Sequence, residues 1–264
     1  MCGRYVVISK ISEIEIQFGV NALGPYNPNF NIGPGSLAPV ITDKDPDKLQ
    51  FFHFGMTPFW AKKKLYFFNA RAEGDHNKDN NPDYHGAMGI ISKPSFRKAI
   101  RSQRCLVIAD AFIEGTTEKK LDEPFLVHLS KGRRPFAFAG IWDEWVDKET
   151  GEIYQSFAII TTTPNSLLQK LPHHRSPVIL PKEKEREWLD QNLPLADVTA
   201  MLQPYDGGDM NAYPISTSIK NPRHNSLELL KPAGPSVATQ KELKVEQEIV
   251  LEGMGFSRAR SRKD

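Results

Sequence analysis

The second residue of the chain is a cysteine, and its place at the start of the sequence can give it two nucleophilic groups. Met1 is followed by Cys2 and Gly3, and a small residue after an initiator Met allows that Met to be removed. The chain would then begin with Cys2, whose free α-amine lies beside its thiol. The amine titrates at about 7.7–8.0 and the thiol at about 8.5, so both are partly nucleophilic at neutral pH. Such an amine condenses with an aldehyde to an imine, which the thiol closes into a thiazolidine ring.

Three later segments place polar side chains at the ends of apolar runs or in turns. They cover residues 69–73, 109–115 and 173–180. Together they hold carboxylate, amide, imidazole and guanidinium groups, which are the groups that proton transfer and anion binding require. A fold that brought these segments to the chain start would surround the aminothiol with acid–base chemistry.

These segments and residues 1–4 together resemble the SRAP family (SOS-response-associated peptidase, or abasic-site processing proteins). The matching motifs are M-C-G-R, N-A-R-x-E, C-L-x-x-A-D-x-F-x-E and H-x-R-x-P-V-I-L, found here at residues 1–4, 69–73, 105–114 and 173–180. Residues 30–35, 55–60, 93–97 and 214–216 are also similar. No one motif is decisive, but their joint occurrence in this order is highly specific. The resemblance runs from Met1 to about Pro232.

The resemblance implies a sensor of abasic sites in single-stranded DNA, acting in the DNA damage and SOS responses. Cys2 would be the nucleophile that forms a covalent thiazolidine crosslink and protects the lesion. Glu114 would take a proton from the amine and return one as water leaves, and Asn69 would hold the Cys2 backbone or the sugar oxygen. His173 would protonate the ring oxygen as the sugar opens, a role that suits a group titrating near physiological pH. His174 stands at a variable position and is expected to face solvent.

A binding surface for DNA is also expected. Arginine offers bidentate donors to phosphate, and aromatic faces stack on bases of any sequence. The DNA contacts that we predict are Arg4, Asn31, Pro34, Trp60, Arg71, Phe96, Arg97, Thr161 and Arg175. The alternative for each arginine is a structural ion pair, and the alternative for Phe96 is a place in the core.

Three departures from the family pattern bear on these predictions. Gly115 follows Glu114 where Trp is usual, so packing around the acid is expected to differ. Ser176 stands where Met or Arg is usual. The polar stretch 74–92 is longer than the usual connection and is predicted to be a flexible insertion. Its extra length weakens the alignment of residues 93–97 with the DNA-contacting positions of the family.

Composition sets the broad class. The chain has 264 residues, of which 39% are hydrophobic and 25% charged, with a net charge of +2. Its two cysteines, Cys2 and Cys105, form no disulfide framework and no metal-binding motif, so neither a metal nor a cofactor is expected. The absence of a signal peptide and of a long apolar run predicts a cytoplasmic protein without membrane contact, nucleoid-associated when bound to DNA. We expect a monomer, with replication-fork DNA as a further partner.

The hydrophobic pattern predicts an α+β fold with a mostly antiparallel, curved or barrel-like sheet and flanking helices. Strands are predicted at residues 5–8, 37–41, 49–56, 65–70, 105–108, 125–129, 136–142, 154–162, 178–180 and 210–215. Helices are predicted at residues 12–18 (with Ser12 as the cap), 95–102, 164–171 and 182–191. Residues 1–232 should form the single SRAP-like domain. Residues 233–264 should form a linker and a flexible charged tail.

Other classes stay open at this stage. An N-terminal-nucleophile hydrolase or another Cys-type peptidase also uses a cysteine of this kind. A plain single-strand DNA-binding module would release the DNA when salt is added, whereas a covalent crosslink would survive denaturation. The sequence leaves open whether Met1 is removed autocatalytically or by an aminopeptidase, whether the crosslink reverses, and whether the protein has lyase activity.

Overall fold

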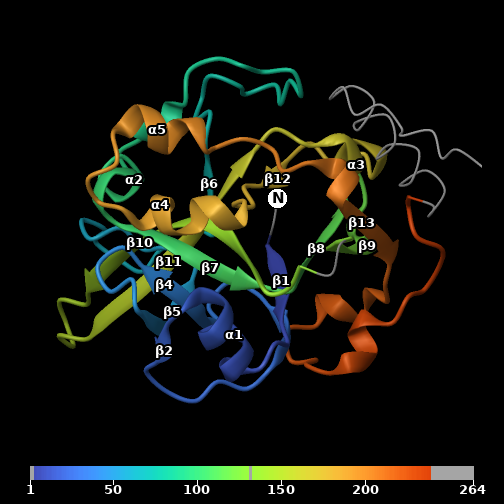
Figure 1. The fold of residues 1–264 in the computed structure, drawn as a ribbon, viewed down its shortest axis with the longest axis horizontal. Coiled ribbons are helices and arrows are strands. Elements are labelled where there is room, and N and C mark those ends of the chain that lie inside the picture. The colour runs from blue at the N-terminus through green and yellow to red at the C-terminus, as the bar shows by residue number, and fades with distance from the viewer. Residues whose placement is uncertain (1–2, 131–132, 239–264) are drawn as a thin grey trace, which may run out of the picture.

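The computed structural model of the protein describes residues 3–130 and 133–238, which form two groups of strands flanked by short helices (Figure 1). Cys2 and the predicted charged tail from residue 239 onward lie outside the described residues. The predicted α+β class with a curved, mostly antiparallel sheet is confirmed.

The first group of strands closes into a five-stranded barrel. Its members are β4 (Leu37–Thr42), β5 (Lys48–Phe54), β7 (Arg104–Ala109), β10 (Phe136–Val146) and β11 (Ile153–Thr162). They pair antiparallel in the order β11-β10-β7-β4-β5. A parallel pairing of β5 with β11, at Ser156 with His53 and Phe157 with Phe54, closes the ring. Closure removes the two free edges that an open sheet would leave.

Short strands extend this barrel. They are β2 (Asn21–Ala22) on β5, and β6 (Asn69–Arg71) and β12 (Ser176–Pro177) on β11. The β6 pairing is parallel and sets Asn69 beside Ile159 and Arg71 beside Thr161. Two predicted motif segments are therefore attached to one barrel strand.

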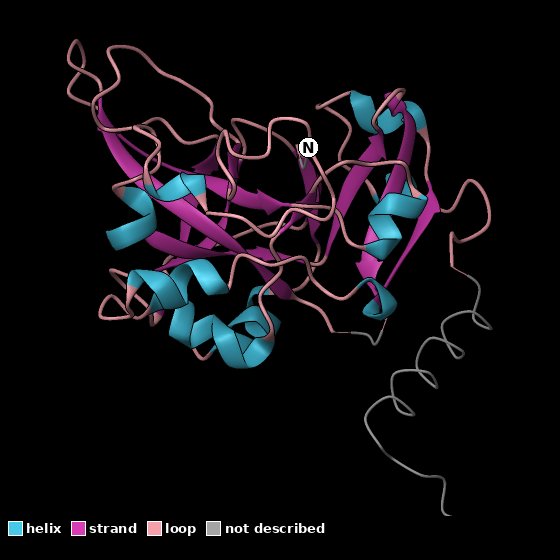
Figure 2. Ribbon diagram, turned by 90° about the horizontal axis from the view of Figure 1, so that it is seen from above, coloured by secondary structure: helices cyan, strands magenta, loops and turns pink. Residues whose placement is uncertain are grey.

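The second group is a five-stranded sheet in the order β13-β9-β8-β1-β3. Its strands are β1 (Arg4–Val7), β3 (Asn29–Ile32), β8 (Ala111–Thr116), β9 (Lys120–Leu129) and β13 (Met210–Pro214). Only Asp110 separates β7 of the barrel from β8 of this sheet, and its carboxylate accepts the backbone N–H groups of Ile8 and Ser9 at 2.6 and 2.7 Å. The view from above shows the two groups of strands with short helices on their outsides (Figure 2).

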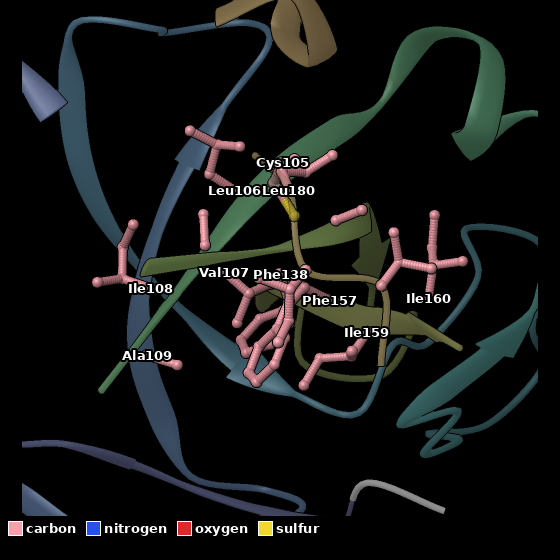
Figure 3. Close-up of a cluster of buried hydrophobic side chains, with 14 of the residues drawn as sticks. Cys105, Leu106, Val107, Ile108, Ala109, Phe138, Phe157, Ile159, Ile160 and Leu180 are labelled. Atoms are coloured by element: carbon pink, nitrogen blue, oxygen red, sulfur yellow. The ribbon is translucent and has the colours of Figure 1, made fainter. Parts of the chain in front are cut away.

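The core lies inside the barrel and continues under β1. Figure 3 shows Phe138 and Phe157 side by side among the aliphatic side chains of β7 and β11. Phe157 stacks on Phe54 with ring centroids 5.3 Å apart. Cys105 belongs to this cluster, and burial raises the pKa of its thiol well above the ordinary value, which makes it unreactive.

The helices are short and lie outside the strands. They are α1 (Ile11–Phe18), α2 (Ala99–Ser102), α3 (Ser166–Lys170), α4 (Glu185–Leu189) and α5 (Leu195–Ala200), with 3₁₀ turns η1 (Gly89–Ile91), η2 (Lys182–Lys184), η3 (Gly207–Asp209), η4 (Thr217–Lys220) and η5 (Leu227–Leu230). The prediction of Ser12 as a helix cap is wrong. The helix begins one residue earlier because the Glu13 carboxylate accepts the Lys10 backbone N–H at 2.8 Å.

Residues 74–92 form a series of turns fastened to the barrel. The Asn77 side chain accepts a hydrogen bond from the Asn81 backbone N–H at 2.8 Å. The backbone carbonyl of Asn77 accepts a hydrogen bond from the Arg71 guanidinium at 3.0 Å. Within the described residues, no helix is long and apolar enough to cross a membrane.

Candidate active site

The start of β1, the end of β8 and the loop after α3 enclose a pocket of about 360 Å³. Its lining residues are Gly3, Arg4, Phe68, Ile113, Glu114, Gly115, Thr116, Thr117, Lys120, Leu121, His173 and His174. Three predicted site residues, Arg4, Glu114 and His173, therefore meet in one cavity. Gly3, the residue after Cys2, lines the same cavity.

Glu114 and His173 form a buried pair. They come from β8 and from the loop after α3, and their side chains are 4% and 5% exposed. The Glu114 Oε2 atom lies 3.4 Å from Nε2 of His173. Burial raises the pKa of Glu114 to about 7, because a carboxylate loses its hydration there. Burial also lowers the pKa of His173 to about 3.

The hydrogen bond of His173 to a backbone carbonyl fixes which ring nitrogen carries the hydrogen. Its Nδ1 lies 2.8 Å from the backbone carbonyl of Gly115, and a carbonyl can only accept, so Nδ1 carries the hydrogen. In the neutral ring, Nε2 then presents a lone pair to Glu114. A proton on the carboxyl group removes the repulsion between the facing lone pairs, and burial, which raises the pKa of Glu114 and lowers that of His173, favours this form. Near neutral pH the imidazole is neutral and the carboxyl group is partly protonated.

Asn69 adjoins this pocket from the barrel side. It begins β6, is half-buried, and donates from Nδ2 to the carbonyl of Phe68 at 3.0 Å. Phe68 itself lines the pocket. Asn69 is thus next to a wall of the cavity, although its own role stays a prediction.

The expectation that His174 faces solvent is wrong. The side chain is half-buried and lines the pocket, and its ring stacks on His173 at a centroid distance of 5.1 Å. Its Nδ1 lies 2.9 Å from the hydroxyl of Thr117 on the β8–β9 hairpin. The sequence offered a signal only in the adjacency of two histidines.

Gly115 has a geometric reason to replace the bulky residue usual at its position. A Cβ at Gly115 would lie 1.7 Å from the carbonyl oxygen of Lys120, across a β-bulge in the β8–β9 pairing. The glycine lets the hairpin fold back tightly, so that Thr117 and Lys120 form a wall of the pocket. No sequence motif points to Thr117 or Lys120, and the Gly-Thr-Thr run at residues 115–117 is the one local sign of the bulge.

Arg175 is held in a buried ion pair. Its guanidinium donates to Glu73 Oε2 at 2.8 Å and to the Thr161 carbonyl at 2.7 Å, and Arg175 is 1% exposed. Thr161 is buried beside it. This arrangement favours the structural alternative for Arg175 over a phosphate contact, and it ties the His173 loop to β11.

Asn31 is also buried, at the junction of β3 with the segment around η4. Its Nδ2 donates to three backbone carbonyls, those of residues 219, 221 and 224, at 3.0–3.2 Å. Its Oδ1 accepts from Arg4 at 2.6 Å. Asn31 thus orients Arg4 at the mouth of the pocket, and the geometry favours this positioning role over a direct DNA contact.

The remaining predicted DNA contacts differ in accessibility. Trp60 is 49% exposed, and Pro34 and Arg97 are exposed. Arg71 is half-buried, and Phe96 packs edge-on against Phe67 with centroids 5.8 Å apart. Trp60 and Arg97 therefore keep the reach that stacking and phosphate contacts need. Phe96 is anchored in the core on one side.

Comparison with known proteins identifies the class. The family model of the SOS response associated peptidase (SRAP) matches residues 1–222, so the chain belongs to this family. In the described part of the chain, no group of His, Cys, Asp and Glu side chains is arranged to hold a metal ion.

Particular relatives agree with this assignment. The chain is similar to the abasic site processing protein YoqW of Bacillus subtilis, with 36% identity over 88% of this chain and 99% of that protein. It is 25% identical to the abasic site processing protein HMCES of Gallus gallus over 84% of this chain and 70% of that protein. A crystal structure from Bacteroides thetaiotaomicron matches with a TM-score of 0.75 and 28% identity, covering 88% of this chain and all (100%) of the other.

Proposed function

We propose that this protein captures abasic sites in single-stranded DNA as a covalent thiazolidine crosslink through Cys2, after removal of Met1. The observation that carries the proposal is the meeting of Gly3, Glu114 and His173 in one pocket. The names of relatives such as YoqW and HMCES, both abasic site processing proteins, support a DNA lesion as the substrate.

The covalent chemistry balances without a cofactor. An abasic deoxyribose opens from its cyclic hemiacetal to an aldehyde at C1′. The Cys2 amine nitrogen adds to C1′, and the carbonyl oxygen leaves as water. The thiol sulfur then adds to the imine carbon. One C–N and one C–S bond form. Both amine hydrogens leave with the carbonyl oxygen as water when the imine forms, and the thiol hydrogen then goes to the ring nitrogen.

The buried pair supplies the proton transfers. Loss of water from the carbinolamine needs an acid, and the pKa of about 7 keeps much of Glu114 in its acid form near neutral pH. When a base is needed, the carboxylate form of Glu114 takes the proton, because a pKa of about 7 also populates that form near neutral pH. The lowered pKa of His173 leaves its Nε2 without a proton to give, so in this proposal His173 positions the Glu114 carboxyl group at 3.4 Å, and Glu114 rather than His173 protonates the ring oxygen.

Arg4, held by Asn31 at 2.6 Å, offers a cation for a phosphate next to the lesion. Residues 1–232 are proposed as the functional domain, acting as a monomer on the cell's DNA, including replication-fork DNA. The crosslink would shield the lesion from strand scission.

The test uses the full-length mature protein and a uracil-containing single-stranded oligonucleotide treated with uracil glycosylase. On a denaturing gel, a shifted band should require the abasic site and vanish in Cys2→Ala. Intact mass should show the sum of protein and DNA minus one water. Cys105→Ala is the matched control, because the other thiol is buried in the barrel. If mature protein gives no band, the proposal fails, and an amide substrate then tests the hydrolase alternative.

A further inference from the structure

The two adjacent imidazoles of the pocket are held in the same way. Nδ1 of His173 is fixed by the Gly115 carbonyl at 2.8 Å, and Nδ1 of His174 by the Thr117 hydroxyl at 2.9 Å. The Thr117 hydroxyl donates its single hydrogen to the carbonyl of Pro172 at 2.7 Å. Its oxygen must therefore accept from His174, so Nδ1 of His174 carries the hydrogen.

This tautomer leaves Nε2 of His174 as a lone pair. Among the described residues, that atom has no hydrogen-bond partner, whereas Nε2 of His173 faces Glu114. The side chain of His174 lines the pocket. The cavity therefore contains an acid, Glu114, and a separate proton acceptor, His174.

Opening of a cyclic hemiacetal requires these two functions together. A base takes the proton of the hydroxyl on C1′, the bond from C1′ to the ring oxygen breaks, and an acid protonates that oxygen. The products are the aldehyde and a hydroxyl on C4′.

We propose that His174 is the general base for this ring opening, with Thr117 as its positioning residue and Glu114 as the matching acid. The inference rests on the proposed function, because it deepens the same site. The proton from the C1′ hydroxyl goes to His174 Nε2, the bonding pair goes to the ring oxygen, and the Glu114 proton completes the new hydroxyl. Solvent then returns His174 and Glu114 to their starting forms.

The surroundings keep His174 in its basic form near neutral pH. Burial lowers its pKa, and the positive charges of Arg175 on its own segment and Arg71 on β6 lower the pKa further. The other charged or titratable groups that line the pocket in the described residues are Arg4 on β1, Lys120 on β9, Glu114 on β8 and His173 beside it in the chain. The lone pair is thus available at the pH at which the Cys2 amine reacts.

The test compares two single-stranded oligonucleotides under single-turnover conditions. One carries a natural abasic site, and the other carries an open-chain 4′-deoxy aldehyde that cannot close into a ring. His174→Asn keeps a donor for Thr117 but lacks a base, and should slow crosslinking of the natural site roughly 10²-fold. It should leave the open-chain aldehyde at the wild-type rate.

Variants of Thr117 test the positioning role. Thr117→Val should slow the natural substrate and shift its pH–rate profile, because His174 loses the acceptor that fixes its tautomer, whereas Thr117→Ser should restore the wild-type profile. Thr150→Val, at a surface turn, is the control. Equal slowing of both substrates by His174→Asn, or no slowing of either, overturns the inference. A wild-type protein that crosslinks neither substrate overturns the proposed function itself.

Discussion

Glu114 and His173 lie together in a place where each side chain is at most 5% exposed. Burial disfavours a charge on either group, which explains why a histidine beside a carboxyl group has a lowered rather than a raised pKa. The sequence singled out both residues as candidates, but it could not give the direction of the two pKa shifts, which depends on how deeply the fold buries each side chain.

The Glu114 pKa predicts a pH-dependent stability. A carboxyl group whose pKa rises from 4.5 to about 7 on folding stabilises the fold fully below pH 4.5, and loses that contribution as pH rises through 7. Glu114→Gln retains a donor toward His173 and does not titrate. The unfolding free energy of Glu114→Gln relative to wild type should therefore rise by about 3 kcal/mol between pH 4.5 and pH 8.5.

Urea unfolding of both proteins across this range measures the difference. His173, whose pKa falls to about 3 on folding, contributes stability above pH 6.5 that is lost toward pH 3. That contribution is present in both proteins and cancels to first order. A difference that stays constant with pH would contradict a protonated Glu114.

The ion pair of Arg175 predicts the outcome of a second substitution. Arg175→Met leaves the buried Glu73 carboxylate without its cation and should cost about 3–5 kcal/mol of unfolding free energy. Glu73→Met combined with Arg175→Met should recover most of that loss, because no unpaired charge stays buried. Chemical denaturation checks both, with the exposed Arg97→Met as the control. Full stability of Arg175→Met together with weaker, less salt-dependent DNA binding would instead support the phosphate contact.

At the scale of elements, the β8–β9 hairpin shapes one wall of the pocket, and its tight fold depends on Gly115. Gly115→Ala would bring a Cβ to within 1.7 Å of the Lys120 carbonyl oxygen, so the hairpin would have to move. We expect a loss of about 2 kcal/mol in stability, in the range of overpacked sites. Crosslinking should also slow, since Gly115 and Thr117 hold the two imidazoles.

Gly24→Ala is the matched control for this hairpin prediction. The added Cβ there would meet only a ring carbon of Phe51, at 3.9 Å. Thermal unfolding and single-turnover crosslinking of both variants give the two readouts. Wild-type values for Gly115→Ala in both would show that the bulge does not shape the site.

The sequence predicted elements best where the local pattern carried the signal. Apolar runs marked β7, β10 and β11 within a few residues, because buried strands need apolar side chains on both faces. The predicted strand 65–70 was displaced, since Phe67 makes only a single antiparallel bridge with Met56, and the regular strand is Asn69–Arg71, which pairs with β11. The parallel closure of β5 on β11 and the hairpin bulge depend on distant pairings, which no local pattern encodes.

For the molecule as a whole, the groups proposed for DNA binding and those proposed for the reaction lie in different regions. The pocket holds the buried pair of Glu114 and His173, whereas Trp60 is 49% exposed and follows Phe59, whose ring centroid lies 4.2 Å from the Lys98 ammonium. Because the net charge is only +2, the whole molecule attracts DNA weakly, and the attraction must come from local groups such as Lys98. Recognition of the strand and chemistry at the lesion should therefore be separable by mutation.

Trp60→Ala tests this separation. Loss of one stacking face should weaken binding by about 1–3 kcal/mol, which raises the protein concentration needed for half-maximal crosslinking rate. The rate at saturation should stay at the wild-type value, because Glu114 and His173 are untouched.

Added salt should likewise raise the half-maximal concentration and leave the saturating rate unchanged. Glu114→Gln should show the opposite pattern, and Leu227→Ala, an exposed apolar residue on η5, should show neither effect. A saturating rate that falls with Trp60→Ala would mean that the exposed loop takes part in aligning the lesion with the pocket.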